Sequence, residues 1–88
     1  MASLEELRKE ITAIDDEMAA LFVKRMQVSS DIAAVKKANG LPVFDPAREE
    51  ENLSKAGSRV PEDLSAYYRD FLRECMELSK AYQRDCNA

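Results

Sequence analysis

The stretch Ser3–Gly40, SLEELRKEITAIDDEMAALFVKRMQVSSDIAAVKKANG, decides the fold of this chain. Its apolar residues form one stripe, made of Leu4, Leu7, Ile11, Ile14, Met18, Leu21, Val28, Ile32 and Val35. The steps along this stripe alternate between three and four residues, as on one face of an α-helix. One slot holds no apolar residue, and it is occupied by Arg25. The pattern therefore predicts a long helix whose apolar seam carries a single cation.

The ends of this helix are marked by local signals. Ser3 and Glu6 have the spacing of a capping box, and Gly40, followed by Pro42, suits the end of the helix. A helix over about 4–39 would be about 55 Å long, whereas a compact chain of this size is only about 30 Å across. The helix must extend beyond its own domain, and its bare apolar stripe needs a cover. We therefore expect an intertwined homodimer.

Two further helices are expected after the first one. Asp45 followed by Pro46 predicts a helix start, and Gly57 predicts its end, which places this helix at about 46–56. Pro61 opens a third helix over about 61–85. The apolar face expected for it consists of Leu64, Tyr68, Phe71, Leu72, Cys75, Leu78 and Tyr82. The chain is thus predicted to be one all-α domain, 1–88, with three helices and no strands.

Composition narrows the possible functions. The 88 residues carry a net charge of −4, which argues against partners such as nucleic acid or an anionic membrane. The chain has no His, so neither a Cys/His nucleophile pair nor a Cys/His metal site can form. Cys75 and Cys86 would lie about 16 Å apart on one helix, too far for a disulfide. No apolar run is long enough to span a membrane, and the expected location is the cytoplasm.

Two cations of the first helix share one face. Lys36 follows Arg25 by eleven residues, which returns to within about 20° of the same direction, about 16 Å along the axis. Together they could bracket an anion. The alternative for Arg25 is a buried ion pair or a polar residue that sets the register of two helices.

Arg8 lies seventeen residues before Arg25, about 25 Å away along the same helix. It cannot join the other two cations within one chain. If two copies of the helix cross antiparallel near Met18, Arg8 of one chain meets the segment from Arg25 to Lys36 of the other. Taken singly, Arg8 is an ordinary solvated helix residue.

Five more polar residues are candidates, each with an ordinary structural alternative. Asp45 is an N-cap, and Arg48 and Glu49 could form an exposed ion pair. Ser79 could bond its own helix backbone, and Gln83 could face water. None of these residues indicates a function alone.

As a set, these residues resemble the pattern of the all-helical class of chorismate mutases, from Leu4 to Gln83. That family has an Arg, a second Arg seventeen residues on and a Lys eleven beyond it, matched by Arg8, Arg25 and Lys36. Its D-x-x-R-E motif is matched by Asp45, Arg48 and Glu49, and its F-x₇-S-x₃-Q series by Phe71, Ser79 and Gln83.

The resemblance implies an activity and an assembly. The family converts chorismate, a dicarboxylate enol ether, into prephenate on the route to Phe and Tyr, without cofactor or metal. Its members are homodimers with two active sites, each completed by an Arg of the partner chain. On this chain the resemblance assigns the carboxylates to Arg25 and the partner's Arg8, with Ser79 and Asp45 helping to place the substrate. It assigns the ring hydroxyl to Arg48 and Glu49, and the ether oxygen to Lys36 and Gln83.

The expected catalytic residues are therefore Lys36, Gln83, Arg25 and Glu49, within a substrate site that also includes Arg8, Asp45, Arg48 and Ser79. Two alternatives remain. One is isochorismate-pyruvate lyase, which has the same fold and similar clamps. The other is a non-catalytic helical dimerisation module in which Arg25 only sets register. The residues do not decide whether the domain is stand-alone or part of a fused enzyme.

Overall fold

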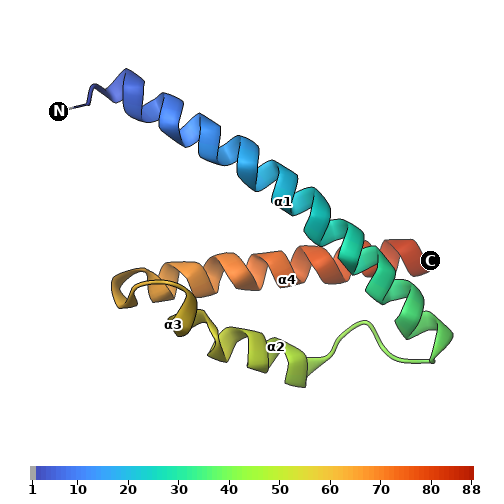
Figure 1. Cartoon of the computed structure of the whole chain (residues 1–88). Coiled ribbons are helices and arrows are strands. Elements are labelled where there is room, and N and C mark those ends of the chain that lie inside the picture. The colour runs from blue at the N-terminus through green and yellow to red at the C-terminus, as the bar shows by residue number, and fades with distance from the viewer. Residues whose placement is uncertain (1) are drawn as a thin grey trace.

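The computed structural model describes residues 2–88, so residue 1 of the expected domain lies outside it. The helices are α1 (Leu4–Ala38), α2 (Pro46–Ser54), the short α3 (Ala56–Arg59) and α4 (Ser65–Asn87), with a 3₁₀ turn, η1 (Glu62–Leu64), before α4 (Figure 1). Residues 2–88 contain no strand. The prediction of an all-α fold with three main helices is confirmed. In this part of the chain, no helix has both the length and the apolar character needed to cross a membrane.

Helix α1 has the caps that its sequence predicts. The Ser3 hydroxyl accepts a hydrogen bond from the Glu6 N–H at 3.1 Å. At the other end, Gly40 has φ of 65°, the left-handed conformation in which a residue without Cβ carries no steric penalty. Local interactions therefore set both limits of this helix.

The apolar stripe of α1 is not buried within one chain. All nine of its apolar residues are between 42% and 63% exposed. The N-terminal half of α1 diverges from α4 (Figure 1), so no other helix among residues 2–88 covers it. As expected, α1 extends beyond the rest of the domain. The exposed apolar surface is larger than expected, because the stripe also stays exposed where α1 packs on α4.

A different edge of α1 packs against α4. Ser29 and Ala33 are buried there, and small side chains let the two helices approach closely. The buried residues of α4 are Leu72, Met76, Ser79 and Gln83. Of the apolar face predicted for this helix, Leu72 is buried within the chain and Tyr68 and Cys75 are half-buried, whereas Leu64, Phe71, Leu78 and Tyr82 are 39–51% exposed. Polar residues that carry the site take part of the buried face instead.

The bounds of the two later helices differ in part from the prediction, although α2 begins at Pro46 as expected. Helix α2 ends at Ser54, and Gly57 lies inside α3 instead of ending α2. The hydroxyls of Ser54 and Ser58 bond the carbonyls of Glu51 and Lys55, which competes with a continuous helix at this point. The third expected helix starts with the 3₁₀ turn, closed by a 3.0 Å hydrogen bond from the Leu64 N–H to the Pro61 carbonyl, and the α-helix proper starts at Ser65.

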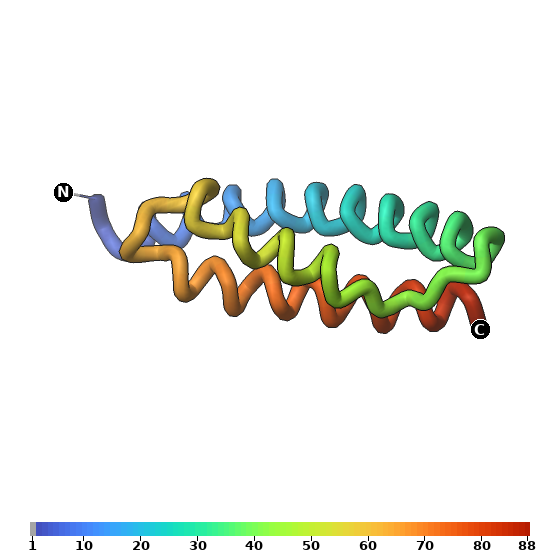
Figure 2. Tube along the Cα trace, turned by 90° about the horizontal axis from the view of Figure 1, so that it is seen from below, coloured from blue at the N-terminus to red at the C-terminus, as the bar shows by residue number. Residues whose placement is uncertain are grey.

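The chain is elongated, 56 Å along its longest axis. Helices α1, α2 and α4 run along this axis, and the two termini lie at opposite ends (Figure 2). The linker between α1 and α2 crosses beside the C-terminal part of α4. This arrangement brings α1, the linker, α2 and α4 around one common space.

Candidate active site

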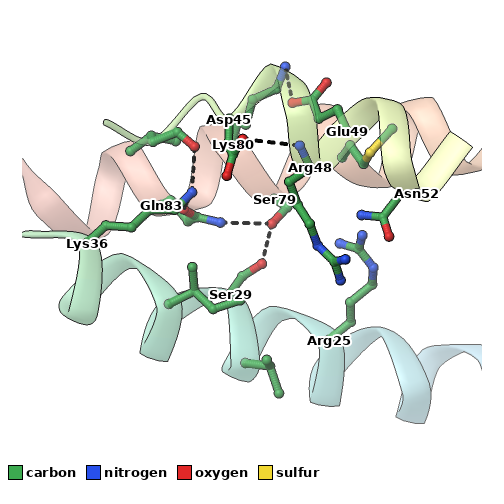
Figure 3. A pocket seen from close by; sticks show the side chains of 14 residues that line it. Arg25, Ser29, Lys36, Asp45, Arg48, Glu49, Asn52, Ser79, Lys80 and Gln83 are labelled. Carbon is green, nitrogen blue, oxygen red and sulfur yellow. Dashed lines mark hydrogen bonds and ion pairs between the residues drawn. The ribbon is translucent and has the colours of Figure 1, made fainter. Parts of the chain in front are cut away.

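An open pocket of about 450 Å³ lies among α1, the linker, α2 and α4 (Figure 3). Seven of the eight predicted site residues line it: Arg25, Lys36, Asp45, Arg48, Glu49, Ser79 and Gln83. They come from three helices and the linker. The residues that the sequence spacing indicated therefore line one space in the folded chain.

Arg8 is the eighth predicted residue, and it lies outside this pocket. It sits on the exposed N-terminal part of α1, in a shallow depression with Glu5, Lys9 and Thr12. One chain alone does not bring Arg8 to the other residues, as the length of α1 requires.

Lys36 is anchored at the end of the pocket nearest the linker. Its ammonium donates to the Val43 carbonyl at 2.6 Å and to Gln83 Oε1 at 3.4 Å. A lysine has three N–H donors, so one remains for a ligand. The first contact also holds the linker against α1, and the position of the ammonium is thereby fixed.

Gln83 and Ser79 belong to a buried row of hydrogen-bonded side chains across the interface of α1 and α4. Gln83 is 5% exposed, and its amide N–H donates to the Ser79 hydroxyl at 3.2 Å. The Ser79 hydroxyl in turn is hydrogen-bonded to that of Ser29. Ser79 therefore does not bond its own backbone, and Gln83 does not face water. The amide nitrogen of Gln83 keeps a second N–H free for a ligand.

Arg25 enters the pocket without a carboxylate partner among residues 2–88. Its guanidinium donates to the Cys75 carbonyl at 3.3 Å, which steadies it against α4. Arg25 from α1 and Arg48 from α2 point into the same end of the pocket (Figure 3). Two cations directed at one space favour an anion between them. The buried ion pair considered for Arg25 is not found.

The first turn of α2 presents three candidate residues. Asp45 is the N-cap, and its carboxylate accepts from the Arg48 N–H at 3.1 Å. Arg48 and Glu49 do not pair with each other: Arg48 lies 3.4 Å from Glu51, and Glu49 lies 3.0 Å from Lys80. Both side chains thus retain unused hydrogen-bonding capacity toward the pocket.

Three polar residues that line the pocket were not predicted from the sequence: Ser29, Asn52 and Lys80. Ser29 lies four residues after Arg25 and seven before Lys36, a helical spacing that could have identified it. Asn52 follows Arg48 by four and could have been found in the same way. Lys80 precedes Gln83 by three, also a helical spacing, but its contact with Glu49 could not be read from the sequence, because only the fold brings the two residues together. Hydrogen bonds to Glu77, and then to Glu49, raise the pKa of the Lys80 ammonium.

The charge of the pocket differs in sign from that of the chain. Arg25, Lys36, Arg48 and Lys80 face Asp45 and Glu49, which leaves the lining with two positive charges in excess. The whole chain carries −4. A concave site with convergent donors and this charge suits a small dianion. Within residues 2–88, no group of three or more His, Cys, Asp or Glu side chains is placed to hold a metal ion.

These features define a helical protein with a cationic pocket that suits a small dianion. The chain belongs to the chorismate mutase type II family, whose pattern it matches over residues 7–84. The family membership expected from the sequence motifs is thereby confirmed.

Similar proteins agree with this membership. The bifunctional chorismate mutase/prephenate dehydratase of Aquifex aeolicus is 33% identical across 91% of this chain and 25% of that protein. The T-protein of Haemophilus influenzae is 43% identical across 56% of this chain and 13% of that protein. A solved structure, a conserved hypothetical protein from Pyrococcus furiosus, has a TM-score of 0.77 and 35% identity, covering 94% of this chain and 97% of that one. This chain spans a quarter or less of the length of the two curated relatives.

Proposed function

We propose that this chain is a chorismate mutase that converts chorismate into prephenate in the biosynthesis of Phe and Tyr. The observation that carries the proposal is the pocket, in which seven residues of the expected set converge with an excess of positive charge. Chorismate is a dicarboxylate, so the charge of the lining complements that of the substrate. The family membership supports the same reaction.

The proposed chemistry needs no nucleophile, cofactor or proton transfer. In a Claisen rearrangement a C–O bond breaks while a C–C bond forms within one molecule. Catalysis then requires that the substrate be held in its folded conformer and that charge growing on the ether oxygen be stabilised. Arg side chains grip carboxylates in a fixed two-pronged geometry, which selects one conformer.

The proposed residue roles are those that the family resemblance implies, and the positions of the side chains in the pocket are compatible with them. Lys36 and Gln83 each keep an N–H free at the same end of the pocket, and we assign both to the ether oxygen. Arg25 takes one carboxylate, with Ser79 and Asp45 placing the substrate. Arg48 and Glu49, from the first turn of α2, contact the ring hydroxyl.

The proposal includes a homodimer in which Arg8 of the partner completes each site. The support is the apolar stripe of α1, because so much contiguous exposed apolar surface is unusual in a monomer. A two-fold axis near the middle of α1 would cover both stripes and carry Arg8 to the pocket of the other chain. Both cysteines are free thiols, which suits a reducing compartment, and we place the reaction in the cytoplasm.

The test is to incubate the full chain with chorismate and follow prephenate formation. We expect turnover, and we expect Lys36→Ala to lower kcat/KM by roughly 10²–10³, the usual cost of a lost electrostatic donor. Lys37→Ala is the matched control, because Lys37 is exposed, adjacent and outside the pocket.

Two further measurements separate the alternatives. Pyruvate released from isochorismate, without prephenate from chorismate, would identify a lyase instead. Arg25→Leu should abolish turnover while the protein stays folded, whereas in a dimerisation module it would keep or raise stability with no activity to lose.

A further inference from the structure

Lys80 holds several groups together at the wall of the pocket. Its ammonium lies 3.0 Å from Glu49 Oε2 and 2.6 Å from Glu77 Oε1, and 4.7 Å above the centre of the Phe44 ring. The Lys80 side chain is only 13% exposed, whereas that of Glu77 is 62% exposed. Lys80 therefore reaches inward from α4, with one carboxylate on its pocket side and another toward solvent.

These contacts join parts of the chain that are otherwise weakly connected. Helix α2 has no buried residue, so its own packing does little to fix its first turn. Within residues 2–88, the pair of Lys80 and Glu49 is the one ion pair that links α2 to α4. The contact with Phe44 adds the linker that leads into α2. The position of Glu49 thus depends on Lys80.

We propose that Lys80 is a positioning residue that fixes the Glu49 carboxylate in the wall of the pocket. Lys80 pairs with Oε2 of Glu49 (Figure 3). Building on the proposed function, this leaves Oε1 to accept the ring hydroxyl of the substrate. Lys80 also offsets the negative charge of Glu49, which would otherwise repel a dianion. Hydrogen bonds to Glu77 and Glu49 also raise the pKa of Lys80, which further favours its charged form.

The experiment is a double-mutant cycle on kcat/KM with the full chain. Lys80→Met should lower kcat/KM by roughly 10- to 100-fold, up to the cost of misplacing a catalytic group by about 1 Å. In a Glu49→Gln background the same substitution should cost much less, since the group that it positions is already altered. Lys80→Arg should recover most of the loss, because a guanidinium can also bind a carboxylate and stack on an aromatic ring.

The matched control is Lys55→Met, because Lys55 forms a similar pair with Glu51 on the surface, 3.0 Å apart and outside the pocket. Its kcat/KM should be unchanged. Full activity of Lys80→Met would overturn the inference. An equal loss with and without Glu49 would also overturn it, since Lys80 would then act on the substrate directly. The inference would also be overturned if the loss of activity in Lys80→Met were fully explained by a smaller fraction of folded protein.

Urea unfolding of the same variants tests the pairing without any substrate. The midpoint shift of the double variant should be smaller than the sum of the single shifts, and additive shifts would contradict the pairing. If the unsubstituted chain makes no prephenate, the proposed function fails and this unfolding cycle alone decides whether Lys80 holds Glu49. If the chain is active and Lys80→Met is equally active, only the inference about Lys80 fails.

Discussion

At the residue scale, the proposed reaction depends on side chains that donate hydrogen bonds without first being protonated. Gln83 is such a residue, because its amide donates at any ordinary pH, whereas a carboxylate in its place would have to be protonated. The Gln83 side chain is 5% exposed, and its Oε1 lies 3.4 Å from the Lys36 ammonium. A glutamate there would pair with Lys36 and occupy the donor that the proposed reaction assigns to the ether oxygen.

We therefore predict that the rate does not require acid pH. Activity of the unsubstituted chain should persist from about pH 5 to about pH 8, while Gln83→Glu should lose activity as pH rises through the range where a carboxylic acid ionises. The check is kcat/KM across this range, with circular dichroism to follow folding. A strong loss for the unsubstituted chain between those values, without unfolding, would contradict the role of Gln83.

The titration of Lys80 does not affect the pH profile of the unsubstituted chain. Its pKa is raised in the folded chain by hydrogen bonds to Glu77 and Glu49. Because this pKa is raised, the charged Lys80 stabilises the folded state fully at any pH below the ordinary pKa of a lysine. That stabilisation is lost only as pH rises through the higher pKa of the folded state. Across the neutral range its contribution is therefore constant.

At the element scale, the two glycines have opposite roles, although both lie close to helix ends. Gly40 follows α1 with φ of 65°, and a Cβ there would meet no atom within 4 Å, so any cost of a side chain comes from the backbone conformation alone. Gly57 lies in the helical conformation of α3, where the nearest atom to an added Cβ is Ser65 Oγ at 3.9 Å.

This contrast predicts effects of opposite sign for the same substitution. Gly40→Ala should destabilise the fold by about 1 kcal/mol, the cost of a Cβ in the left-handed region. Gly57→Ala should stabilise it by about 0.4–1 kcal/mol, because alanine loses less backbone entropy on folding. Urea unfolding at one fixed protein concentration measures both. Equal effects of the two substitutions would show that the end of α1 is not held as described.

At the scale of the whole molecule, the proposed site contains residues of two chains. Arg8 and the pocket lie on separate parts of α1, and the stripe between them is exposed. A homodimer that crosses these stripes gives each pocket Lys36 from its own chain and Arg8 from its partner. Single substitutions at the two positions should then complement each other.

We predict that Arg8→Ala and Lys36→Ala, each nearly inactive alone, regain activity when unfolded together and refolded as a mixture. In a mixed dimer one site has both native residues and the other has neither, so random pairing restores roughly a quarter of all sites. The assay is prephenate formation before and after mixing. Activity that stays at the level of the separate variants would show that Arg8 does not act across the interface.

The sequence alone determined features that depend on residues near one another in the chain. The ends of α1 follow from Ser3, Glu6 and Gly40, and the start of α2 follows from Asp45 and its hydrogen bond to the Arg48 N–H. Helical spacing and the family pattern also identified seven pocket residues. Such features are readable because capping bonds and helical faces are set within a few residues.

Only the tertiary structure decided which faces meet. The pairing of Lys80 with Glu49, the hydrogen bond between Ser29 and Ser79, and the exposed stripe of α1 all depend on how helices distant in sequence are placed. The choice of Leu72 over Phe71 for the buried face of α4 arises in the same way. Packing selects among several amphipathic faces by fit against a partner helix, and the sequence of either helix alone does not contain that fit.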